Sequence, residues 1–256
     1  MAYLGVRENL SFMVRVILSI WLIAFILPAA WSVSTTRDSR VDSNIISYTV
    51  DPKLQDISLY WKDDSGHILG SIQRLKDYLE HKDKKLVFAT NGGMFKTDHS
   101  PVGLFIQQEI MLAPLDTSAG NGNFYLKPNG VFYLTKDKKA NICPTTEFRS
   151  SEQVKFATQS GPMLLINNVI HPAFKDGSTN VNIRNGVGIL PNGNIVFAMS
   201  KEAINFYEFA KYFKSLGCQN ALYLDGFVSK TYLPEKKWIQ TDGDFGVIIA
   251  VTVPEE

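Results

Sequence analysis

The stretches that decide the fold are FATNGGMF (residues 88–95) and its later counterpart ALYLDGFVSK (221–230). Each begins as an apolar run typical of a buried strand and then changes abruptly to Asn or Asp followed by glycine. A glycine-bearing corner has little side-chain cover, so its backbone can approach a ligand closely. We therefore expect two core strands that end at corners able to hold a ligand.

The remaining segments predict a sheet-rich domain. Apolar or alternating runs predict strands at 45–50, 56–61, 85–90, 103–107, 123–126, 130–135, two within 154–167, 182–190, 194–200, 221–226, 230–233 and 246–253. The turn sequences KPNG (127–130) and PNG (191–193) predict hairpins. Helical spacing of apolar residues predicts helices over 71–81 and about 204–216, the second ending at Gly217. This pattern indicates an α+β fold, a single domain with a mostly antiparallel sheet and about two main helices packed on it.

The N-terminus has the pattern of an export signal. Arg7 and Arg15 precede the apolar run VILSIWLIAFILPAAW (16–31), and Ala30 and Ser32 form a small-x-small cleavage pattern. The apolar run is somewhat short for a helix that spans a bilayer.

This pattern divides the chain into three parts. We expect residues 1–34 to be a signal peptide or N-terminal anchor, 35–44 a linker, and 45–256 the folded domain. The domain is then exported to the periplasm or the extracellular space. If the signal is not cleaved, residues 12–31 would anchor it in the membrane.

Composition excludes several classes of protein. The 256 residues carry a formal net charge of +1, with 45% hydrophobic and 20% charged residues. These values are ordinary for a globular protein and give no field that would attract nucleic acid. The two cysteines, Cys143 and Cys218, are too widely spaced for a structural zinc site. One disulfide or two free thiols remain as alternatives.

Four expected strand ends combine a polar residue with glycine: Asn91-Gly92-Gly93, Ser160-Gly161-Pro162, Arg184-Asn185-Gly186 and Asp225-Gly226. Free backbone N–H groups at such corners can form an anion-binding concavity. Together, the four polar side chains could hold a phosphate and a sugar hydroxyl while the carboxylate transfers protons. Each corner taken alone is more typical of an ordinary turn than of a binding site.

The order of these motifs resembles the phosphodiester glycosidase domain family over residues 85–251, on NGGMF (91–95), QSGPMLL (159–165), RNGVG (184–188) and YLDGFVS (223–229). GNFYLKPNGVFYL (122–134) is similar to the small bacterial exported branch of that family. The family also includes the catalytic domain of the mannose-6-phosphate uncovering enzyme. The resemblance implies hydrolysis of an N-acetylglucosamine-like sugar-1-phosphodiester to free sugar and a phosphomonoester.

One departure from the family pattern lies beside the expected acid. The fuller pattern is Leu-Asp followed by three glycines and Ser, whereas here Phe227 and Val228 stand between Gly226 and Ser229. Two residues that could lie close to a ligand are thus replaced by bulkier ones.

Asp225 and Arg184 are the expected catalytic residues. Asp225 ends a buried strand, where its pKa could be tuned, although a turn aspartate that caps its own backbone is the alternative. Arg184 would hold the phosphodiester through its planar guanidinium, with a structural salt bridge as the alternative.

The resemblance and the corner chemistry give the expected substrate-binding residues Asn91, Gly92, Gly93, Ser160, Gly161, Gly226 and Ser229. Ser160 is expected to form hydrogen bonds rather than act as a nucleophile. His99 or His171 could approach it in space, but both are expected to be solvated loop residues. Candidates for a second carboxylate are Asp98, Glu109 and Asp244, of which Asp244 is favoured because it flanks Gly243 beside the last expected strand. Each of the three taken alone is more typical of a surface charge.

The sequence therefore predicts an exported hydrolase that acts on a sugar-phosphodiester or glycan substrate. We expect no metal, no cofactor and no nucleic acid, and membrane contact only through an uncleaved N-terminal segment. The alternative is a non-catalytic envelope protein that binds glycans or glycosyl-phosphates. Phe227 and Val228 favour the binding protein, while Arg184 together with Asp225 favours the enzyme.

Overall fold

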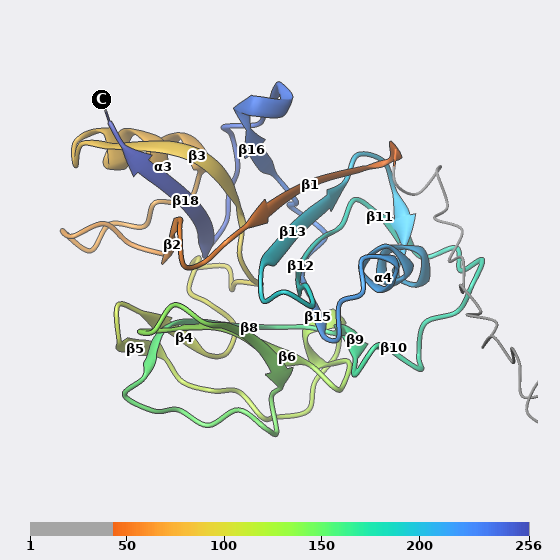
Figure 1. Cartoon of the computed structure of the whole chain (residues 1–256). Coiled ribbons are helices and arrows are strands. Elements are labelled where there is room, and N and C mark those ends of the chain that lie inside the picture. The colour runs from red at the N-terminus through yellow and green to blue at the C-terminus, as the bar shows by residue number, and fades with distance from the viewer. Residues whose placement is uncertain (1–42, 256) are drawn as a thin grey trace, which may run out of the picture. The chain divides into compact units, whose positions relative to one another are not determined.

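The structure, a computed structural model, describes residues 43–255, which belong to one compact unit. The expected signal peptide or anchor (1–34) lies outside the described residues. Three antiparallel sheets and the helices α3 (Ile72–Glu80) and α4 (Phe206–Ser215) make up this unit (Figure 1). The prediction of an α+β fold with mostly antiparallel sheet is confirmed.

The first sheet, called here the central sheet, contributes most of the strand ends discussed below. Its order is β1 (Ile45–Val50), β13 (Ile195–Ser200), β12 (Asn185–Ile189), β15 (Ala221–Asp225), β9 (Met163–Ile166) and β10 (Val169–Ile170). The expected PNG hairpin joins β12 to β13, with Gly193 at φ 87°. In the register of β12 and β15, Asn185 lies opposite Asp225, so two of the predicted corners are direct neighbours.

The second sheet carries helix α3 on one face, and we call it the α3 sheet. Its order is β17 (Trp238–Ile239), β16 (Thr231–Leu233), β3 (Lys84–Asn91), β18 (Ile248–Pro254) and β2 (Asp56–Tyr60). Ser71 accepts the hydrogen bond of the Arg74 N–H and so caps α3, whose Ile72, Leu75 and Leu79 are buried. Strand β3 ends at Asn91, as the sequence predicts.

The third sheet has the order β5 (Ile110–Ala113), β4 (Phe105–Gln107), β8 (Val154–Ser160), β6 (Gly130–Thr135) and β7 (Ala140–Pro144). A short ribbon pairs β11 (Val181–Asn182) with β14 (Ile204–Asn205), and two 3-10 turns, η1 (Asn123–Tyr125) and η2 (Pro234–Lys236), complete the elements.

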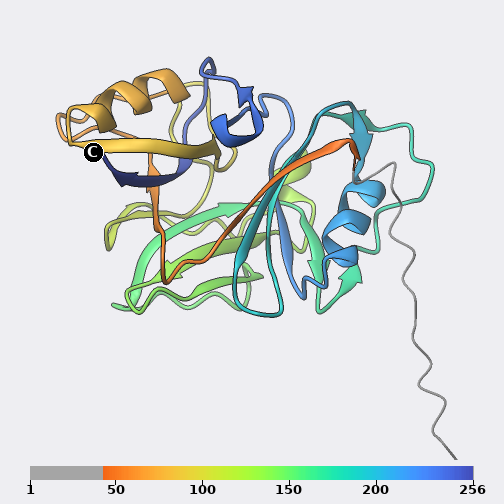
Figure 2. The ribbon, with the colours of Figure 1, turned by 45° about the horizontal axis from the view of Figure 1, so that its top comes forward.

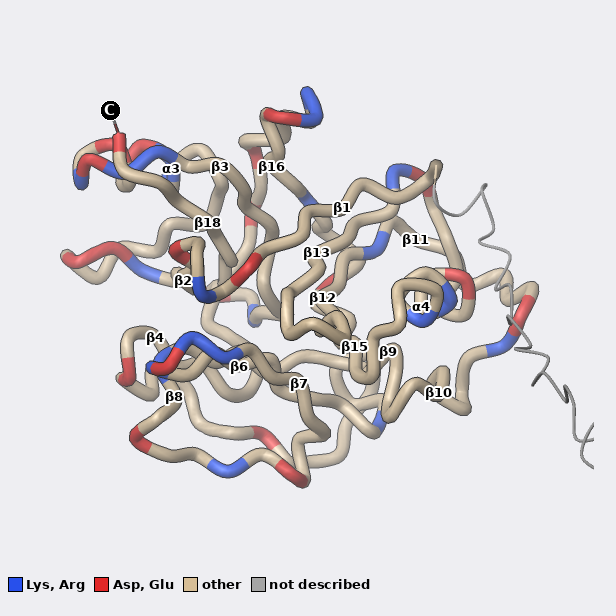
Figure 3. The backbone as a smooth tube through the Cα atoms, in the orientation of Figure 1, with Lys and Arg blue, Asp and Glu red and all other residues tan. Residues whose placement is uncertain are grey.

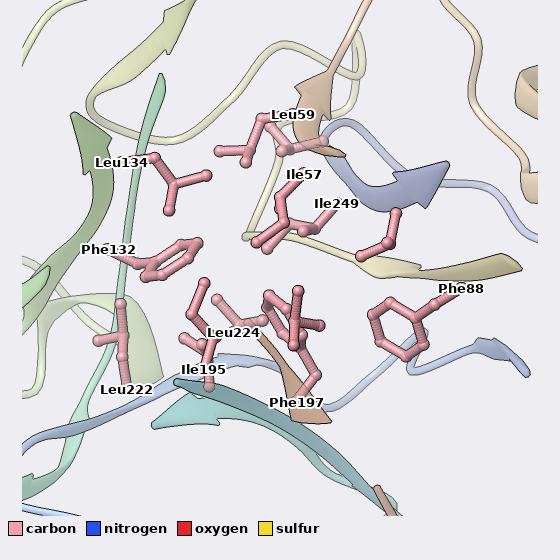
Figure 4. Packing of buried hydrophobic residues seen from close by; sticks show 14 of the residues in the cluster. Ile57, Leu59, Phe88, Phe132, Leu134, Ile195, Phe197, Leu222, Leu224 and Ile249 are labelled. Carbon is pink, nitrogen blue, oxygen red and sulfur yellow. The ribbon is translucent and has the colours of Figure 1, made fainter. Parts of the chain in front are cut away.

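One apolar core joins the three sheets. Phe88 of the α3 sheet, Phe132 of the third sheet and Phe197 of the central sheet point toward one another (Figure 4). The ring centroids of Phe88 and Phe197 lie 5.2 Å apart. Burying each such side chain contributes roughly 1.5–3 kcal/mol. This shared core fixes the strand ends of different sheets relative to one another.

Helix α4 covers the opposite face of the central sheet (Figure 2). Asn205 caps it by accepting the N–H of Glu208 at 2.9 Å, and Phe209 and Phe213 are fully buried against the sheet. Gly217 ends the helix at φ 81°, as predicted.

Two local predictions are wrong. Residues 123–126 form the 3-10 turn η1 instead of a strand, because Phe124 is the buried anchor of a turn whose carbonyl accepts from the Asn129 side chain. KPNG (127–130) consequently does not close a hairpin. Strands β5 and β7 were not predicted, and β5 leaves Ile110, Met111 and Leu112 exposed without the alternation that marks a half-buried strand.

The two cysteines are free thiols in this structure. Burial raises the pKa of the Cys143 thiol to about 11 and that of Cys218 to about 12, so neither is a thiolate near neutral pH. Among residues 43–255, no helix combines the length and apolar character needed to cross a membrane.

Candidate active site

The ends of β3, β12 and β15 meet at the buried side chain of Asn185. Its Nδ2 donates to the backbone oxygen of Asn91 at 2.7 Å and to Asn91 Oδ1 at 3.0 Å. Its Oδ1 accepts the backbone N–H of Asp225 at 2.9 Å. One amide therefore joins the Asn-Gly-Gly corner to the Asp-Gly corner.

Asn91 is fully buried, and its side chain mainly stabilises the junction between β3 and β12. Its Oδ1 accepts the backbone N–H of Lys230 at 3.0 Å in addition to the bond from Asn185. Its Nδ2 has no hydrogen-bond partner among the residues that the structure describes. This amide is thus a buried side-chain donor of the corner that is left for a ligand or water.

Gly92 and Gly93 are required by packing between sheets. The N–H of Gly92 donates to Val247 O at 2.8 Å, and its carbonyl accepts from Thr158 Oγ1 at 3.0 Å. A Cβ on Gly92 would lie 2.6 Å from Ile249 Cγ1, and one on Gly93 would lie 2.8 Å from Thr158 Oγ1. The N–H of Gly92, expected to meet substrate, is therefore used inside the protein.

Ser160 and Gly161 tie the third sheet to the central sheet. Ser160 is fully buried, and its hydroxyl donates to Leu224 O at 2.7 Å. A Cβ on Gly161 would lie 2.6 Å from Asn129 Cβ. Ser160 thus holds β15 just before Asp225, and among residues 43–255 its hydroxyl donates to this carbonyl and to no basic side chain.

Both histidines considered as bases for Ser160 are engaged elsewhere. His99 forms a 2.6 Å contact with Asp244 Oδ1 and stacks on Phe95. His171 was expected in solvent but is buried, stacked on Phe174, with Nε2 3.1 Å from the Lys127 carbonyl. Burial lowers the pKa of His171, so it is a neutral structural residue.

Asp225 is both a turn aspartate that caps its own backbone and a buried acid with a shifted pKa, the two alternatives that the sequence left open. It caps its own turn, since Oδ1 accepts the N–H groups of Gly226 at 2.6 Å and Phe227 at 3.1 Å. It is also only 7% exposed, and burial raises its pKa to about 6 against the opposing effect of those two hydrogen bonds. No described residue donates a hydrogen bond to Oδ2. The acid is therefore held in place by one oxygen and can present the other.

Arg184 is fully buried and lies on the α4 side of the central sheet. Its Nε donates to Ile204 O at 2.8 Å, Nη2 donates to Asn180 O at 2.9 Å, and the guanidinium lies 3.6 Å from the Phe206 ring centroid. Burial lowers its pKa. None of the ion pairs within residues 43–255 includes Arg184, so the structural salt bridge that sequence left open is not formed there.

Tyr223 links Arg184 to the turn that carries Asp225. Its hydroxyl accepts from Arg184 Nη1 at 3.4 Å, and burial raises its pKa. A Cβ on Gly226 would lie 1.7 Å from the Tyr223 hydroxyl, so only glycine lets the backbone pass over it. Tyr223 stands two residues before Asp225 in the same strand, and the register shift between them leaves Leu224 as an extra residue opposite β12.

Ser229 stabilises the turn that carries Asp225 through a hydrogen bond to its backbone. Its hydroxyl donates to Asp225 O at 2.8 Å, and it is 9% exposed. The neighbouring Lys230 directs its ammonium away, to Asp242 Oδ2 at 2.7 Å. Ser229 thus shapes the turn through the backbone of Asp225.

The three candidates for a second carboxylate do not join this cluster. Asp98 accepts from the backbone and hydroxyl of Ser100, Glu109 pairs with Lys136 at 2.7 Å, and Asp244 pairs with His99. Acidic and basic residues are otherwise interspersed along the chain (Figure 3). Within the described part of the chain, Asp225 is the single buried carboxylate and Arg184 the single buried Lys or Arg.

Sequence reasoning missed the individual roles of Asn185 and Tyr223. Asn185 was visible only as the middle of Arg-Asn-Gly, and Tyr223 only as an apolar strand residue. The closeness of Tyr223 to the Asp-Gly turn, where Gly226 lies over its hydroxyl, has no local signal in the sequence.

The chain is similar to known proteins in both sequence and fold. The family model for phosphodiester glycosidase matches residues 84–251. The uncharacterized protein YigE of Escherichia coli (strain K12) is 38% identical over 188 residues, which are 73% of this chain and 73% of that protein.

Solved structures share the fold at low sequence identity. The catalytic domain of zebrafish N-acetylglucosamine-1-phosphodiester alpha-N-acetylglucosaminidase, auto-inhibited by its pro-peptide, aligns with a TM-score of 0.52 at 15% identity, covering 81% of this chain and 88% of that one. A putative exported protein of Burkholderia pseudomallei aligns with a TM-score of 0.55 at 11% identity, covering 81% and 73%. The matched family model and the 38% identical relative show that this chain belongs to the phosphodiester glycosidase family.

Proposed function

We propose that this protein hydrolyses a sugar-1-phosphodiester, releasing the free sugar and leaving a phosphomonoester on the other alcohol. The observation that carries the proposal is Asp225, the single buried carboxylate of the described residues, with one oxygen free of hydrogen bonds and a pKa of about 6. A carboxylate with a pKa just below neutral is ionised at working pH and basic enough to accept a proton from water.

In the proposed reaction, Asp225 Oδ2 accepts a proton from water while the water oxygen attacks C1 of the sugar. The bond between C1 and the phosphate oxygen breaks, and its electron pair stays on that oxygen. The products are the free sugar and a phosphomonoester, and Asp225 then returns the proton to solvent.

A phosphomonoester leaving group would explain why a single carboxylate is enough to catalyse cleavage of the bond to C1. Glycosidases that expel an alcohol use a second carboxylic acid to protonate it. A phosphomonoester has a second pKa of about 6 and can depart unprotonated. The lone Asp225 of the described residues therefore fits a phosphodiester substrate better than an ordinary glycoside.

The negative charge on the phosphate calls for a nearby cation, and we assign this role to Arg184. Arg184 and Tyr223 are both fully buried, and Gly226 lies over the Tyr223 hydroxyl. Arg184 would therefore act on the phosphate at a distance, through its charge, which no ion pair with a described residue neutralises.

The sugar we propose is N-acetylglucosamine-like. Support comes from the family membership and from the zebrafish protein, whose name states that it acts on N-acetylglucosamine-1-phosphodiesters. We further propose that the protein acts outside the cytoplasm, on the strength of the apolar N-terminal segment and its two preceding arginines.

A non-catalytic glycan- or glycosyl-phosphate-binding protein is the second candidate. It is favoured by Phe227 and Val228, which replace two glycines of the family pattern beside the acid. The buried Asp225 and Arg184 favour the enzyme, because burying two charges that form no ion pair with a described residue is costly for a protein that only binds.

Hydrolysis in water enriched in ¹⁸O tests the proposal. The purified protein is incubated with methyl N-acetylglucosamine-1-phosphate diester, and both products are analysed by mass spectrometry. Cleavage at C1 places ¹⁸O in the sugar and none in methyl phosphate. Label in the phosphate would reveal attack at phosphorus and contradict the proposal, and unchanged diester with measurable binding would support the binding protein.

A further inference from the structure

The turn that carries Asp225 presents an apolar ring to solvent. Phe227 is 96% exposed, although its backbone N–H is bonded to Asp225 Oδ1 at 3.1 Å. Val228, the next residue, packs against the core beneath α3. Val228 and the two hydrogen bonds to Asp225 fix the backbone of the turn, and from it the Phe227 side chain extends into solvent.

A second apolar segment runs beside this turn. The carbonyl of Ile183 lies 3.2 Å from the position of a Cβ on Gly226 and 3.5 Å from Ser229 Oγ. Ile183 is 40% exposed and Val181 is 47% exposed. We call Ile183 and Phe227 the apolar rim, since Phe227 lies in the turn that holds Asp225 and the carbonyl of Ile183 lies beside that turn.

Polar groups around the apolar rim are already satisfied by the protein. Lys230 pairs with Asp242, and Asn182 Nδ2 donates to Asn180 Oδ1, which also accepts from Arg184. A nucleotide or a second sugar on the far side of the phosphate would need free cations or hydrogen-bond partners here. An aliphatic chain needs neither and gains by covering apolar surface.

We infer that the apolar rim binds the alcohol portion of the phosphodiester and that this portion is a hydrocarbon chain. The inference rests on the proposed function: the substrate class becomes N-acetylglucosamine-1-phosphate esterified to an alkyl or lipid alcohol. Phe227 is the specificity-determining residue, because the glycine of the family pattern would offer the chain no surface. Removing two methylenes from water gives about tenfold tighter binding.

The test compares kcat/KM for the methyl and octyl diesters of N-acetylglucosamine-1-phosphate, using the full chain and octyl ester below its micelle concentration. We expect the octyl ester to be about tenfold better for the wild type, mostly through KM. Phe227→Ala should bring the octyl-to-methyl ratio close to one. The matched control is Leu54→Ala, since Leu54 is 83% exposed on the turn between β1 and β2, and it should keep the wild-type ratio.

Each outcome separates the two proposals. Methyl ester hydrolysed as well as octyl ester by the wild type overturns the inference and leaves the proposed function standing. A Phe227→Ala variant that loses both substrates equally also overturns it, because the ring would then act on the shared sugar. Hydrolysis of neither ester overturns both proposals.

Discussion

The Oδ1 atom of Asn185 accepts the backbone N–H of Asp225 at 2.9 Å. Through its Nδ2 the same side chain donates to the backbone of Asn91, so one buried amide sets the position of the acid relative to the Asn-Gly-Gly corner. Without this amide, the backbone N–H of Asp225, the last residue of β15, would lose the acceptor that Asn185 provides.

Replacement of Asn185 by Ala should destabilise the protein. It leaves the Asp225 N–H and the Asn91 carbonyl buried without this partner, at a cost of about 2–4 kcal/mol in the free energy of unfolding. Urea denaturation measures the loss. Asn182→Ala, at an exposed position of β11, is the control, and a loss from Asn185→Ala as small as that of the control would contradict the assigned role.

Asp225→Asn should stabilise the protein at neutral pH and not at pH 4. Burial raises the Asp225 pKa from 3.8 to about 6, so the folded state favours the protonated acid. The stability from that preference is complete below about pH 4 and is lost as pH rises through 6. At pH 7.5 the asparagine variant should exceed wild type by roughly 3 kcal/mol. Denaturation at both pH values checks this, and a pH-independent difference would argue against a raised pKa.

The pH dependence of kcat/KM should report the same acid. If ionised Asp225 accepts the proton from water, kcat/KM rises with pH through about 6 and then levels off. Initial rates between pH 4.5 and 8 with saturating and limiting substrate test this. A rate that instead falls as pH rises through 6 would mean that protonated Asp225 acts as an acid.

Arg184→Gln should lower kcat/KM by about 10²-fold, because it removes the cation assigned to the phosphate. It should also weaken inhibition by inorganic phosphate, an effect that a purely structural arginine would not produce. The control is Arg149→Gln, an exposed arginine whose guanidinium donates to the carbonyls of Thr146 and Phe148. Equal phosphate inhibition of wild type and Arg184→Gln would refute the assignment.

Gly226→Ala should be harmful mainly through the Tyr223 hydroxyl, since the next nearest residue, Ile183, places its carbonyl 3.2 Å from the added Cβ. The added Cβ would lie 1.7 Å from the Tyr223 hydroxyl but 3.0 Å from its Cζ. We expect Gly226→Ala to reduce stability by about 1–3 kcal/mol, as overpacking does, and to cost much less in a Tyr223→Phe background. A double-mutant cycle by thermal unfolding measures the coupling, and additive effects would show that the hydroxyl is not the obstacle.

The sequence predicted those helices and strands whose apolar spacing can be recognised within a short segment of the chain. The spacing of Ile72, Leu75 and Leu79 indicated α3, and the capped apolar face indicated α4, because these signals lie within a few turns of one helix. Residues 123–126 look like a strand but form a turn, because Phe124 is anchored by contacts from outside the segment. The short strands β10, β11, β14 and β17 have two residues each and carry no periodic signal.

The corners of the site were predictable, but the way they are joined was not. Asn91, Ser160 and Asp225 are visible as polar breaks after apolar runs. That Ser160 bonds the carbonyl before Asp225, 64 residues away, depends on how two sheets pack. The buried, unpaired state of Arg184 likewise depends on the position of α4 and its Phe206. Such contacts are set by tertiary structure rather than by a local pattern.

The most direct test of the account measures turnover and binding together in Asp225→Asn. The variant keeps an oxygen at the position of Oδ1 for the turn and removes the base. With methyl N-acetylglucosamine-1-phosphate diester, we expect release of free sugar to fall by at least about 10²-fold, the scale of general-base catalysis, while calorimetry shows nearly unchanged substrate affinity. Sugar release by a folded Asp225→Asn variant at the wild-type rate would contradict the central claim.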